Sequence, residues 1–355
     1  MKSLLRRNVT VLLGFVVLLF FVSSYAHALT ISPARVEISG DPGQTLRGKY
    51  LLINEQNEPK TFYSSFENFE AQGETGAPNF VAANEGLGTW IASDRTVTLG
   101  PNESRELIYT IKIPENAEPG GNFAAIFWGT TDPRQAKGDK QVMIGAKIGV
   151  LILLRVNGDI EEGGGVIAFN TVRADQFDAV EGDSALASAI GSGSGQRFFS
   201  MLPVEFEYRF QNTGADRIKP EGDIRIKNTL GLTTSVLNAN PHAGNVLPQS
   251  TRKYAVVWNG VDDTKGKPED RLEPPKGFFK TVVYQARHFA FGLYTAEIAL
   301  AYGASGELTD SESFMFFVLP WQLLIVVAIG LLILWQGLKR YNRMIVKRAQ
   351  KVSAK

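Results

Sequence analysis

Apolar and polar residues alternate along much of the chain between residues 29 and 317. The clearest runs place apolar side chains at Leu107, Tyr109, Ile111 and Ile113, at Val204, Phe206, Tyr208 and Phe210, and at Ile224 and Ile226. Because successive residues of a strand face opposite sides of a sheet, this alternation predicts half-buried β-strands. Gln141–Val156 is an almost continuous apolar run, which predicts strands buried within a sheet. With Gly and Pro turns throughout and no helical spacing here, the pattern predicts an all-β fold.

The first 28 residues follow a different pattern. Lys2, Arg6 and Arg7 precede a long apolar run, and Ala26-His27-Ala28 supplies the small residues that a signal peptidase accepts. We therefore predict a signal peptide at residues 1–28, cleaved after Ala28. An uncleaved N-terminal anchor is the alternative.

A second apolar segment, Val318–Leu338, lies near the other end of the chain. It contains no charged residue, and its roughly 21 residues at about 1.5 Å each span about 31 Å, close to the thickness of a bilayer core. Trp321 and Trp335 stand near its ends, and residues 339–355 carry seven Lys or Arg and no acidic residue. The positive-inside rule then predicts a transmembrane helix at 318–338, a basic cytoplasmic tail at 339–355, and residues 29–317 outside the cytoplasm, as in a single-pass type I protein.

Charge and cysteine content narrow the classes of protein that fit. The whole chain has a net charge of +1; residues 1–28 contribute +3 and residues 339–355 contribute +7, which leaves −9 for the part between them. A net acidic domain argues against nucleic acid as a partner. The chain has no cysteine, so an exported domain of this kind is stabilised by burial without disulfides. Its length of about 290 residues predicts two domains.

Three sequence signals occur twice and in the same order. In each half a strand ends at an Asn-containing turn, a Pro-headed turn with an Arg precedes an alternating strand, and a Gly-aromatic pair opens a further strand. The copies are Asn54–Pro59, Leu99–Arg105 and Gly121–Ala125, and then Asn212–Asp216, Val246–Arg252 and Gly292–Ala296. The repeat predicts two copies of one immunoglobulin-like β-sandwich, with a chance match as the alternative.

Together these patterns predict two immunoglobulin-like β-sandwich domains and one C-terminal transmembrane helix. The first sandwich is expected at 29–157, a hinge at 158–165, and the second sandwich at 166–317, with a Gly/Ser-rich loop near 174–200. A second loop, at 262–275, is charged and rich in Pro. Such a loop is either disordered or a place where binding function resides.

Residue types that carry catalysis are sparse. After residue 28 the histidines are His242 and His288, which are far apart, and there is no Cys nucleophile or Gly-x-Ser-x-Gly turn. We predict that the protein is not an enzyme, with no catalytic residues, no metal and no cofactor, and its ligand-binding residues are unknown from the sequence. Trp90, Trp128 and Trp258 are either sugar-stacking platforms or, as sandwich geometry favours, core residues. Trp90 is the best candidate for a platform, because Gly86–Thr89 precede it in an expected loop.

Several turn and strand motifs match a known pattern as a set. They are Ile31–Glu37, Asp41–Gly43, Asn54, Trp90, Leu99–Pro101 and Gly120–Phe123, and then Pro203–Phe206, Gln211–Gly214, Lys219–Gly222, Val246–Pro248, Gly292–Tyr294 and Phe317–Trp321. As a set they resemble the WxL-interacting proteins of bacterial surfaces. The resemblance implies two immunoglobulin-like modules and a C-terminal anchor, the first module associated with peptidoglycan and the second with a protein or host ligand. Gly191–Gly195 is an insertion that departs from that family.

The main functional hypothesis is a membrane-anchored bacterial cell-surface protein for binding or scaffolding, which contacts cell-wall polymer (peptidoglycan) or partner surface proteins through its modules. The alternative is an extracytoplasmic assembly factor, similar to periplasmic pilus chaperones, that completes a partner's sheet with an exposed edge strand. Arg105 and Arg252 are then candidate anchors, although capping a turn is the favoured role of each. An envelope hydrolase, the third hypothesis, requires a cleft with paired carboxylates.

Overall fold

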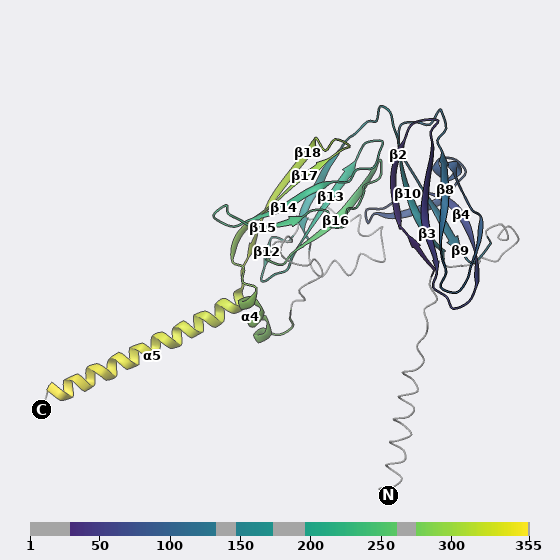
Figure 1. Cartoon of the computed structure of the whole chain (residues 1–355). Coiled ribbons are helices and arrows are strands. Elements are labelled where there is room, and N and C mark those ends of the chain that lie inside the picture. Colours follow the sequence, from purple (N-terminus) through teal and green to yellow (C-terminus); the bar gives the residue numbers. More distant parts are fainter. Residues whose placement is uncertain (1–28, 133–146, 173–195, 261–274, 354–355) are drawn as a thin grey trace, which may run out of the picture. The chain divides into compact units, whose positions relative to one another are not determined.

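The computed structural model describes residues 29–132, 147–172, 196–260 and 275–353 (Figure 1). The chain divides into two compact units: the first consists of Met1–Asn68, Val81–Glu118 and Asn122–Val156, and the second of Phe69–Phe80, Pro119–Gly121 and Asn157–Lys355. Three predicted segments lie outside the described residues, wholly or for the most part. They are the signal peptide, the Gly/Ser-rich loop near 174–200 and the loop at 262–275.

The first unit consists of two sheets and one helical turn, α2 (Leu87–Trp90). The order across the first sheet is β1 (Leu29–Ser32), β3 (Thr45–Asn54), β8 (Ser104–Lys112) and β6 (Ile91–Ser93). The order across the second sheet is β2 (Arg35–Gly40), β10 (Lys147–Val156), β9 (Gly120–Gly129), β4 (Lys60–Gln72) and β5 (Ala77–Ala82), with β7 (Thr96–Leu99) also paired to β4. The outer part of the β4–β5 hairpin, Phe69–Phe80, belongs to the second unit. Apolar side chains from both sheets form one buried core.

The second unit also has two sheets around a core of its own (Figure 1). The order across the third sheet is β11 (Gly164–Thr171), β13 (Val204–Asn212) and β16 (Ser250–Trp258). The order across the fourth sheet is β12 (Phe198–Phe199), β18 (Leu308–Val318), β17 (Gly292–Tyr302), β14 (Glu221–Lys227) and β15 (Thr233–Asn238). The described residues of this unit also form the helices α4 (Phe278–Arg287) and α5 (Trp321–Ser353).

The alternating runs form strands with the predicted faces inward. In β13 the side chains of Val204, Phe206, Tyr208 and Phe210 are fully buried, and the residues between them are half-buried or exposed. β8 and β14 follow the same rule at the predicted positions. The continuous apolar run contains β10, which lies between β2 and β9 and is largely buried. These parts of the all-β prediction are confirmed.

Three local predictions are wrong. Val318, the expected first residue of the membrane helix, is the last residue of β18 and is fully buried, and α5 begins only at Trp321, directly after Pro320. The buried end of β18 and the membrane helix are both apolar, so hydropathy alone does not show where the strand ends and the helix begins. The expected loop before Trp90 is the helical turn α2, and Gly164 and Gly165 of the expected hinge are the first residues of β11.

Helix α4 is a further departure, because no helix was expected before residue 318. Its residues Phe278–Val283 are rich in aromatic and β-branched side chains, which locally favour a strand. The chain enters it through Gly277 at a φ of 104°, and the Thr281 hydroxyl donates to the Gly277 carbonyl at 3.0 Å. Tertiary contacts of Thr281 and Gln285, both buried, override the local preference.

α5 is long and apolar enough to cross a membrane. Trp321–Ile345 has a mean hydropathy of 2.0 over its best stretch, and none of that stretch is buried within the chain. The helix also continues through the predicted basic tail as far as Ser353. Length and composition therefore support a membrane anchor, which begins three residues later than the sequence pattern suggests.

A buried asparagine ends a strand in each unit and ties together two turns. Asn54 donates to the Glu58 carbonyl at 3.0 Å and to the Gly100 carbonyl at 2.8 Å, and accepts the Gln56 N–H at 3.2 Å. Asn212 donates to the Asp216 and Val246 carbonyls at 2.7 and 2.9 Å, and accepts the Gly214 N–H at 2.8 Å. In each unit, two of the partners lie two and four residues after the asparagine, and the third lies in the Pro-headed turn. The predicted repeat thus has a matching set of hydrogen bonds.

The Pro-headed turns also match in backbone conformation. Asn102 follows Pro101 and Gln249 follows Pro248, and both have positive φ, at 54° and 53°. This is the conformation that a Pro-containing type II turn requires at its third residue. Two turns of the same type at equivalent places give the two units the same strand-to-strand connection.

Replacing either asparagine by alanine is expected to destabilise its own unit. Asn54→Ala and Asn212→Ala each leave buried carbonyl and amide groups unpaired, at a cost of about 2–4 kcal/mol in the free energy of unfolding. Hydrogen exchange of the full chain in detergent checks this: exchange should accelerate in β3 and β8 for the first variant, and in β13 and β16 for the second. Exposed Asn57→Ala is the control, expected within about 0.5 kcal/mol; equal protection in all three variants would contradict the proposed tie.

Candidate partner-binding strand edge

Each sheet of the second unit ends in strands whose outer backbone groups need partners. β12 has two residues, β15 six, β11 eight and β16 nine. An unpaired edge strand is a template on which another chain adds a strand. The two long edges, β11 and β16, both belong to the third sheet, and they differ in how they are closed.

The outer edge of β11 is closed by side chains of the fourth sheet. The Val166 N–H donates to the Asp310 carboxylate at 2.6 Å, and the Tyr302 hydroxyl donates to the Gly164 carbonyl. Tyr302 ends β17 and Asp310 lies in β18. A carboxylate and a phenol thus take the positions that a neighbouring strand would occupy, and they block strand addition at the start of β11.

The outer edge of β16 is open over most of its length. The Lys253 N–H donates outward, to the Glu74 carbonyl at 2.7 Å. Because alternate residues of an antiparallel strand direct both backbone groups to the same side, Ala255 and Val257 also direct theirs away from β13. Within the part of the chain that the structure describes, no residue accepts these two N–H groups. The side chain of Ala255 is exposed and that of Val257 is half-buried.

The same hairpin turn that supplies Glu74 secures the beginning of β16. The Glu74 carboxylate and the Arg209 guanidinium form a two-point ion pair, with Arg209 Nε 2.8 Å from one carboxylate oxygen and its terminal nitrogen on the other. The hydrogen bond to this carboxylate is the main cause that raises the pKa of Arg209, so the guanidinium keeps its charge. Paired in this way, the turn limits the free edge to the residues that follow Lys253.

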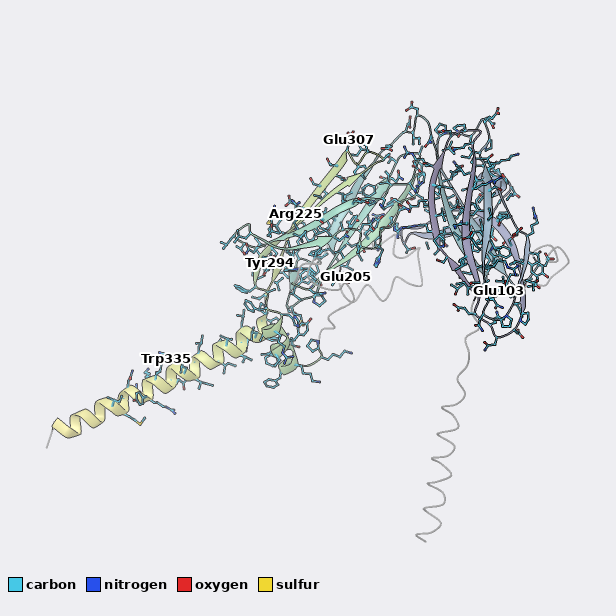
Figure 2. The ribbon with its side chains drawn as sticks, viewed as in Figure 1. Glu103, Glu205, Arg225, Tyr294, Glu307 and Trp335 are labelled. Atoms are coloured by element: carbon cyan, nitrogen blue, oxygen red, sulfur yellow. The ribbon has the colours of Figure 1, made fainter. Side chains whose placement is uncertain are left out.

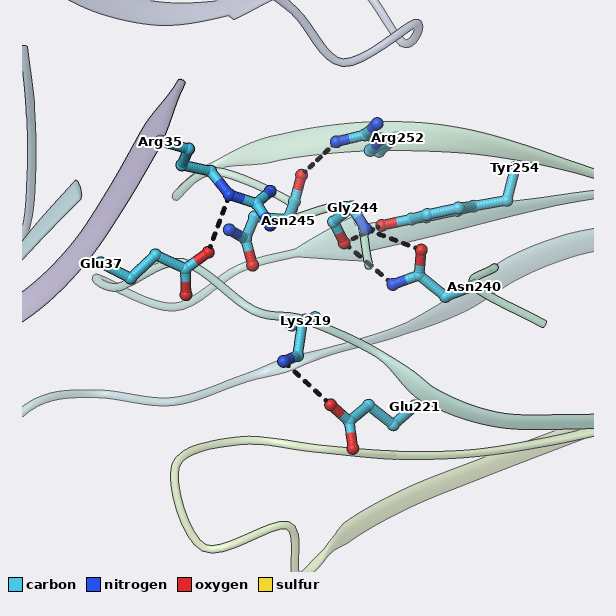
Figure 3. Close-up of polar contacts among 9 residues, drawn as sticks. All are labelled: Arg35, Glu37, Lys219, Glu221, Asn240, Gly244, Asn245, Arg252 and Tyr254. Carbon is cyan, nitrogen blue, oxygen red and sulfur yellow. Dashed lines mark hydrogen bonds and ion pairs between the residues drawn. The ribbon is translucent and has the colours of Figure 1, made fainter. Parts of the chain in front are cut away.

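Arg252 is half-buried, and Figure 3 shows its guanidinium directed to Asn245. Its guanidinium donates to the Asn245 carbonyl at 2.8 Å and lies 5.3 Å from the ring centre of Tyr254. A Cβ added at Gly76 or Gly244 would come within 2.3 or 2.7 Å of it. The guanidinium is therefore packed between two glycines, and this geometry favours the turn-bracing role of Arg252 over that of an anchor.

The turn that Arg252 supports is closed by a further asparagine (Figure 3). The Asn240 side chain donates to the Pro220 and Gly244 carbonyls, each at 3.0 Å, and accepts the Gly244 N–H at 2.8 Å. The Tyr254 hydroxyl donates to the same Gly244 carbonyl at 2.9 Å. Asn240, Gly244 and Tyr254 therefore fix the surroundings of β16, and the edge is presented by a rigid strand.

Arg105, the other candidate anchor, lies on the surface of the first unit. Its guanidinium donates to the Glu103 carboxylate at 2.6 Å, and the Gly100 N–H donates to the same carboxylate at 2.7 Å. The Gly100 N–H, and after it Arg105, lower the pKa of Glu103. Arg105 thus completes the Pro-headed turn through Glu103, which matches the turn-capping role.

Two of the three tryptophans considered as sugar platforms lie inside the sandwiches. Trp128 is fully buried and donates to the Tyr50 hydroxyl at 2.9 Å, and Trp258 is 2% exposed and donates to the Ser235 hydroxyl at 2.9 Å. The core prediction is confirmed for both. Trp90 is half-buried and packs against the core of the first unit. Trp128 and Trp258 therefore present no free ring face of the kind that a stacking platform needs.

The described residues give little support for metal or hydrolytic chemistry. Among them there is no group of three His, Cys, Asp or Glu side chains that could hold a metal ion. A shallow hollow of about 490 Å³ lies over β14, β17 and β18, and Glu221, Asp223 and Asp310 are among the residues that line it. The Asp310 carboxylate already accepts the Val166 N–H, so it has a structural role in closing the edge of β11.

The sequence pattern does not reveal the edge of β16. It identifies Tyr254, Val256 and Trp258 as inward residues, and all three are buried. Ala255 and Val257 between them carry no distinctive chemistry, and their importance comes from the order β11-β13-β16, in which no described strand lies outside β16. The periodicity of a single strand does not encode its place in the sheet.

Comparisons with known proteins give likeness of fold only. No family model matches the chain, and no curated protein does. Among solved structures, the class 5 fimbriae chaperone CfaA is similar with 10% identity and a TM-score of 0.35, over 82% of this chain and 100% of that one. The E. coli chaperone DraB gives 11% and 0.31, over 82% and 97%. The chain in the CsuC–CsuE complex of Acinetobacter baumannii gives 13% and 0.32, over 81% and 97%. At such values the likeness carries no argument about function.

Two buried tyrosines beside the edge predict a loss of stability at alkaline pH. The Tyr208 and Tyr254 rings stack with centres 4.8 Å apart, and burial raises the pKa of both hydroxyls above the ordinary 10.0. Because the folded state holds these protons more tightly than the unfolded state, their stabilisation is complete below pH 10 and is lost as the pH rises further. The melting temperature should therefore fall steeply above pH 10.

Tyr208→Phe separates this effect from general alkaline damage. The variant loses the hydrogen bond to the Ala239 carbonyl, at a cost of about 1 kcal/mol near neutral pH, but its melting temperature should fall less steeply above pH 10. An alkaline slope equal to that of the unmodified protein would contradict the assignment.

Proline substitutions test which side of β16 is open. Ala255→Pro removes an N–H that points away from β13, so the ladder remains and the loss of stability should be small, about 1 kcal/mol. Val256→Pro removes an N–H that bonds to β13 and should cost about 3 kcal/mol or more. Thermal unfolding of the two variants measures the difference. Equal losses would show that Ala255 is not on an open edge.

Proposed function

We propose that this protein is a membrane-anchored bacterial envelope protein whose second unit binds an extended segment of a partner surface protein by strand addition to β16. The observation that carries the proposal is the pair of outward N–H groups at Ala255 and Val257, which no described residue accepts. Both belong to the longest edge strand of the unit. This is the assembly-factor hypothesis with a specified strand.

The chemistry of this edge suits a backbone-directed contact. In strand addition, main-chain hydrogen bonds supply affinity and alternate side chains supply specificity. On β16 the outer face carries Lys253, paired with Glu207 at 3.0 Å, then exposed Ala255 and half-buried Val257. Small and apolar side chains at the two open positions let another backbone approach closely. A partner with a similar alternation of small and apolar residues fits this edge.

The place of action follows from α5. The apolar helix has Trp321 near its start and Trp335 further along, and Lys339, Arg340 and Arg343 follow Leu338. Tryptophans favour the headgroup region, and Lys and Arg stay on the cytoplasmic side. We therefore place both units, as immunoglobulin-like sandwiches, outside the cytoplasm and the C-terminal end of α5 inside it. Binding requires no catalytic residue, cofactor or metal, so the proposed protein is not an enzyme.

Peptidoglycan binding is the weaker hypothesis. It depends on the resemblance to the WxL-interacting proteins, which stays a prediction. Sugar-binding surfaces present free aromatic faces, whereas Trp128 and Trp258 are buried and hydrogen-bonded in the cores. A partner protein explains the open edge of β16, and a wall polymer does not.

A sedimentation experiment with the detergent-solubilised full chain tests the proposal. The protein is mixed with isolated cell-wall sacculi, either bare or still carrying their surface proteins. We expect it to pellet only with sacculi that carry surface proteins. Ala255→Pro should raise the dissociation constant obtained from that fraction by about tenfold, because losing one central hydrogen bond and its geometry costs about 1.4 kcal/mol or more.

Ala255→Ser is the matched control, since it changes the same side chain but keeps the N–H. It should pellet like the unmodified protein. Sedimentation with bare sacculi would establish the wall-polymer function instead. The protein could also pellet with sacculi that carry surface proteins while Ala255→Pro does not weaken this binding. That result would support a protein partner but show that β16 is not its binding edge.

A further inference from the structure

Helix α4 turns its polar side toward the protein and its apolar side outward. Thr281 and Gln285 are 4% and 1% exposed, whereas Phe279 and Val283 are 79% and 52% exposed. A helix on the surface of a water-soluble domain normally does the reverse and buries its apolar stripe against the core. The outward apolar stripe of α4 therefore matches a medium other than water.

The buried Gln285 fixes α4 to the first turn of α5. Its side-chain amide donates to the Ser200 carbonyl at 2.9 Å and to the Gln322 side chain at 2.6 Å, and its carbonyl accepts the Leu323 N–H at 2.9 Å. The Phe278 ring lies 6.3 Å from the Trp321 ring. Figure 1 shows α4 beside the beginning of α5. The exposed stripe of α4 therefore lies at the point where the membrane anchor begins.

Other exposed apolar side chains gather at the same end of the fourth sheet. Gly292 pairs with Val318 at this end, Phe198 pairs with Phe317, and the turn between β14 and β15 is tied to it by the Thr229 hydroxyl, which donates to the Leu293 carbonyl at 3.0 Å. We call this group the apolar collar. Its members are Phe198, Leu230, Leu232, Phe279, Phe289 and Phe291, which are 52–81% exposed.

The described segments that form the apolar collar carry cations and no acidic residue. Residues 196–203, 226–234, 275–295 and 315–345 contain no Asp or Glu. Their cations outside α5 are Arg197, Lys276, Lys280 and Arg287, together with Lys227, which pairs with Glu297 of β17. On α4, Lys280 and Arg287 lie beside the apolar stripe of Phe279 and Val283 by their helical spacing. An apolar stripe flanked by Lys and Arg is the pattern of helices that lie in the lipid headgroup region.

The opposite end of the same sheet has the opposite character. There Tyr302 pairs with Leu308, and the connecting turn is polar and includes Glu307, which Figure 2 shows at the far end of the unit from α5. Glu221, Asp223 and Asp310 lie near this end. The contrast argues against a general excess of surface apolar residues as the explanation, because on the fourth sheet the most exposed large apolar side chains lie beside α5, whereas Leu308 at the other end is 37% exposed.

We propose that α4 and the apolar collar lie in the headgroup region of the membrane that α5 crosses, so that the second unit rests directly on the lipid surface. The proposal depends on α5 as the anchor, which belongs to the proposed function. Phe279, Val283 and the collar side chains enter the boundary between headgroups and acyl chains, and Lys276, Lys280 and Arg287 contact lipid phosphates. The unit is then fixed at two places, α5 and the collar.

The absence of cysteine allows a direct depth measurement on the full chain. Single-cysteine variants Ala286→Cys, Leu230→Cys, Glu307→Cys and Gly330→Cys are labelled with an environment-sensitive fluorophore and reconstituted in vesicles of phosphatidylcholine and phosphatidylglycerol. Lipids brominated near the glycerol end of their acyl chains serve as the quencher. Labels at 286 and 230 should be quenched by about twofold or more, as expected for side chains within the interface, and the label at 307 should not.

The label at 330, in the middle of α5, reports the anchor separately. Quenching at 330, 286 and 230 but not at 307 supports the proposal. If the label at 330 is quenched but the labels at 286 and 230 are as little quenched as the label at 307, the lipid contact of α4 and the apolar collar is overturned. In that case α5 remains the membrane anchor. No quenching at 330 overturns both the anchor and the lipid contact that depends on it.

A second set of variants tests the chemistry of the contact. Phe279→Asp should lower the quenching of the 286 label to the level of the 307 label, because an exposed carboxylate opposes entry into lipid, whereas Phe279→Leu should leave it unchanged. Phe279 is 79% exposed, so both variants keep the fold. Equal quenching in the two variants would show that the collar does not enter the lipid.

Discussion

The buried side-chain amide at the end of β3 and β13 is the constraint on which the architecture of both units depends. A sandwich must turn its chain at the ends of strands, where backbone groups lose their ladder partners and are still shielded from water. One asparagine satisfies three such groups in each unit, two carbonyls and one N–H. It joins the turn after its own strand to the Pro-headed turn before the next strand of the same sheet. Register, turn conformation and core alignment follow from that junction.

The two long edge strands of the third sheet show how the hydrogen bonding of outer backbone groups decides which edge of a sheet stays open. On β11, Asp310 and Tyr302 reach across from the fourth sheet and take the place of a missing strand. On β16, within the described residues, only Lys253 directs its outer N–H to such a partner, the Glu74 carbonyl. The difference between the two edges concerns a few hydrogen bonds, yet it separates a protected edge from an open one.

The sequence predicts much of the fold because many of its strands have one solvent-exposed face and one buried face. The alternation in β13 specifies which side chains enter the core, and the repeated turns at Asn54 and Asn212 identify two related units. Features that depend on contacts with other elements cannot be predicted from such a pattern. Phe278–Val283 has the local composition of a strand and becomes helical through the contacts of Thr281 and Gln285, and Val318 is apolar because it ends a buried strand. The edge of β16 depends on strand order, which no single segment encodes.

The shortness of the open edge has a consequence for how long anything stays on it. From the Lys253 carbonyl to the Val257 carbonyl, β16 directs five backbone groups outward, and each hydrogen bond to such a group contributes a net 0.5–1.5 kcal/mol or so. Association of two molecules costs at least about 4 kcal/mol in lost translational and rotational freedom. The backbone contacts alone therefore do little more than offset that cost. Under the proposed function, a segment bound here dissociates quickly unless its side chains add contacts, so bound and free segments exchange rapidly.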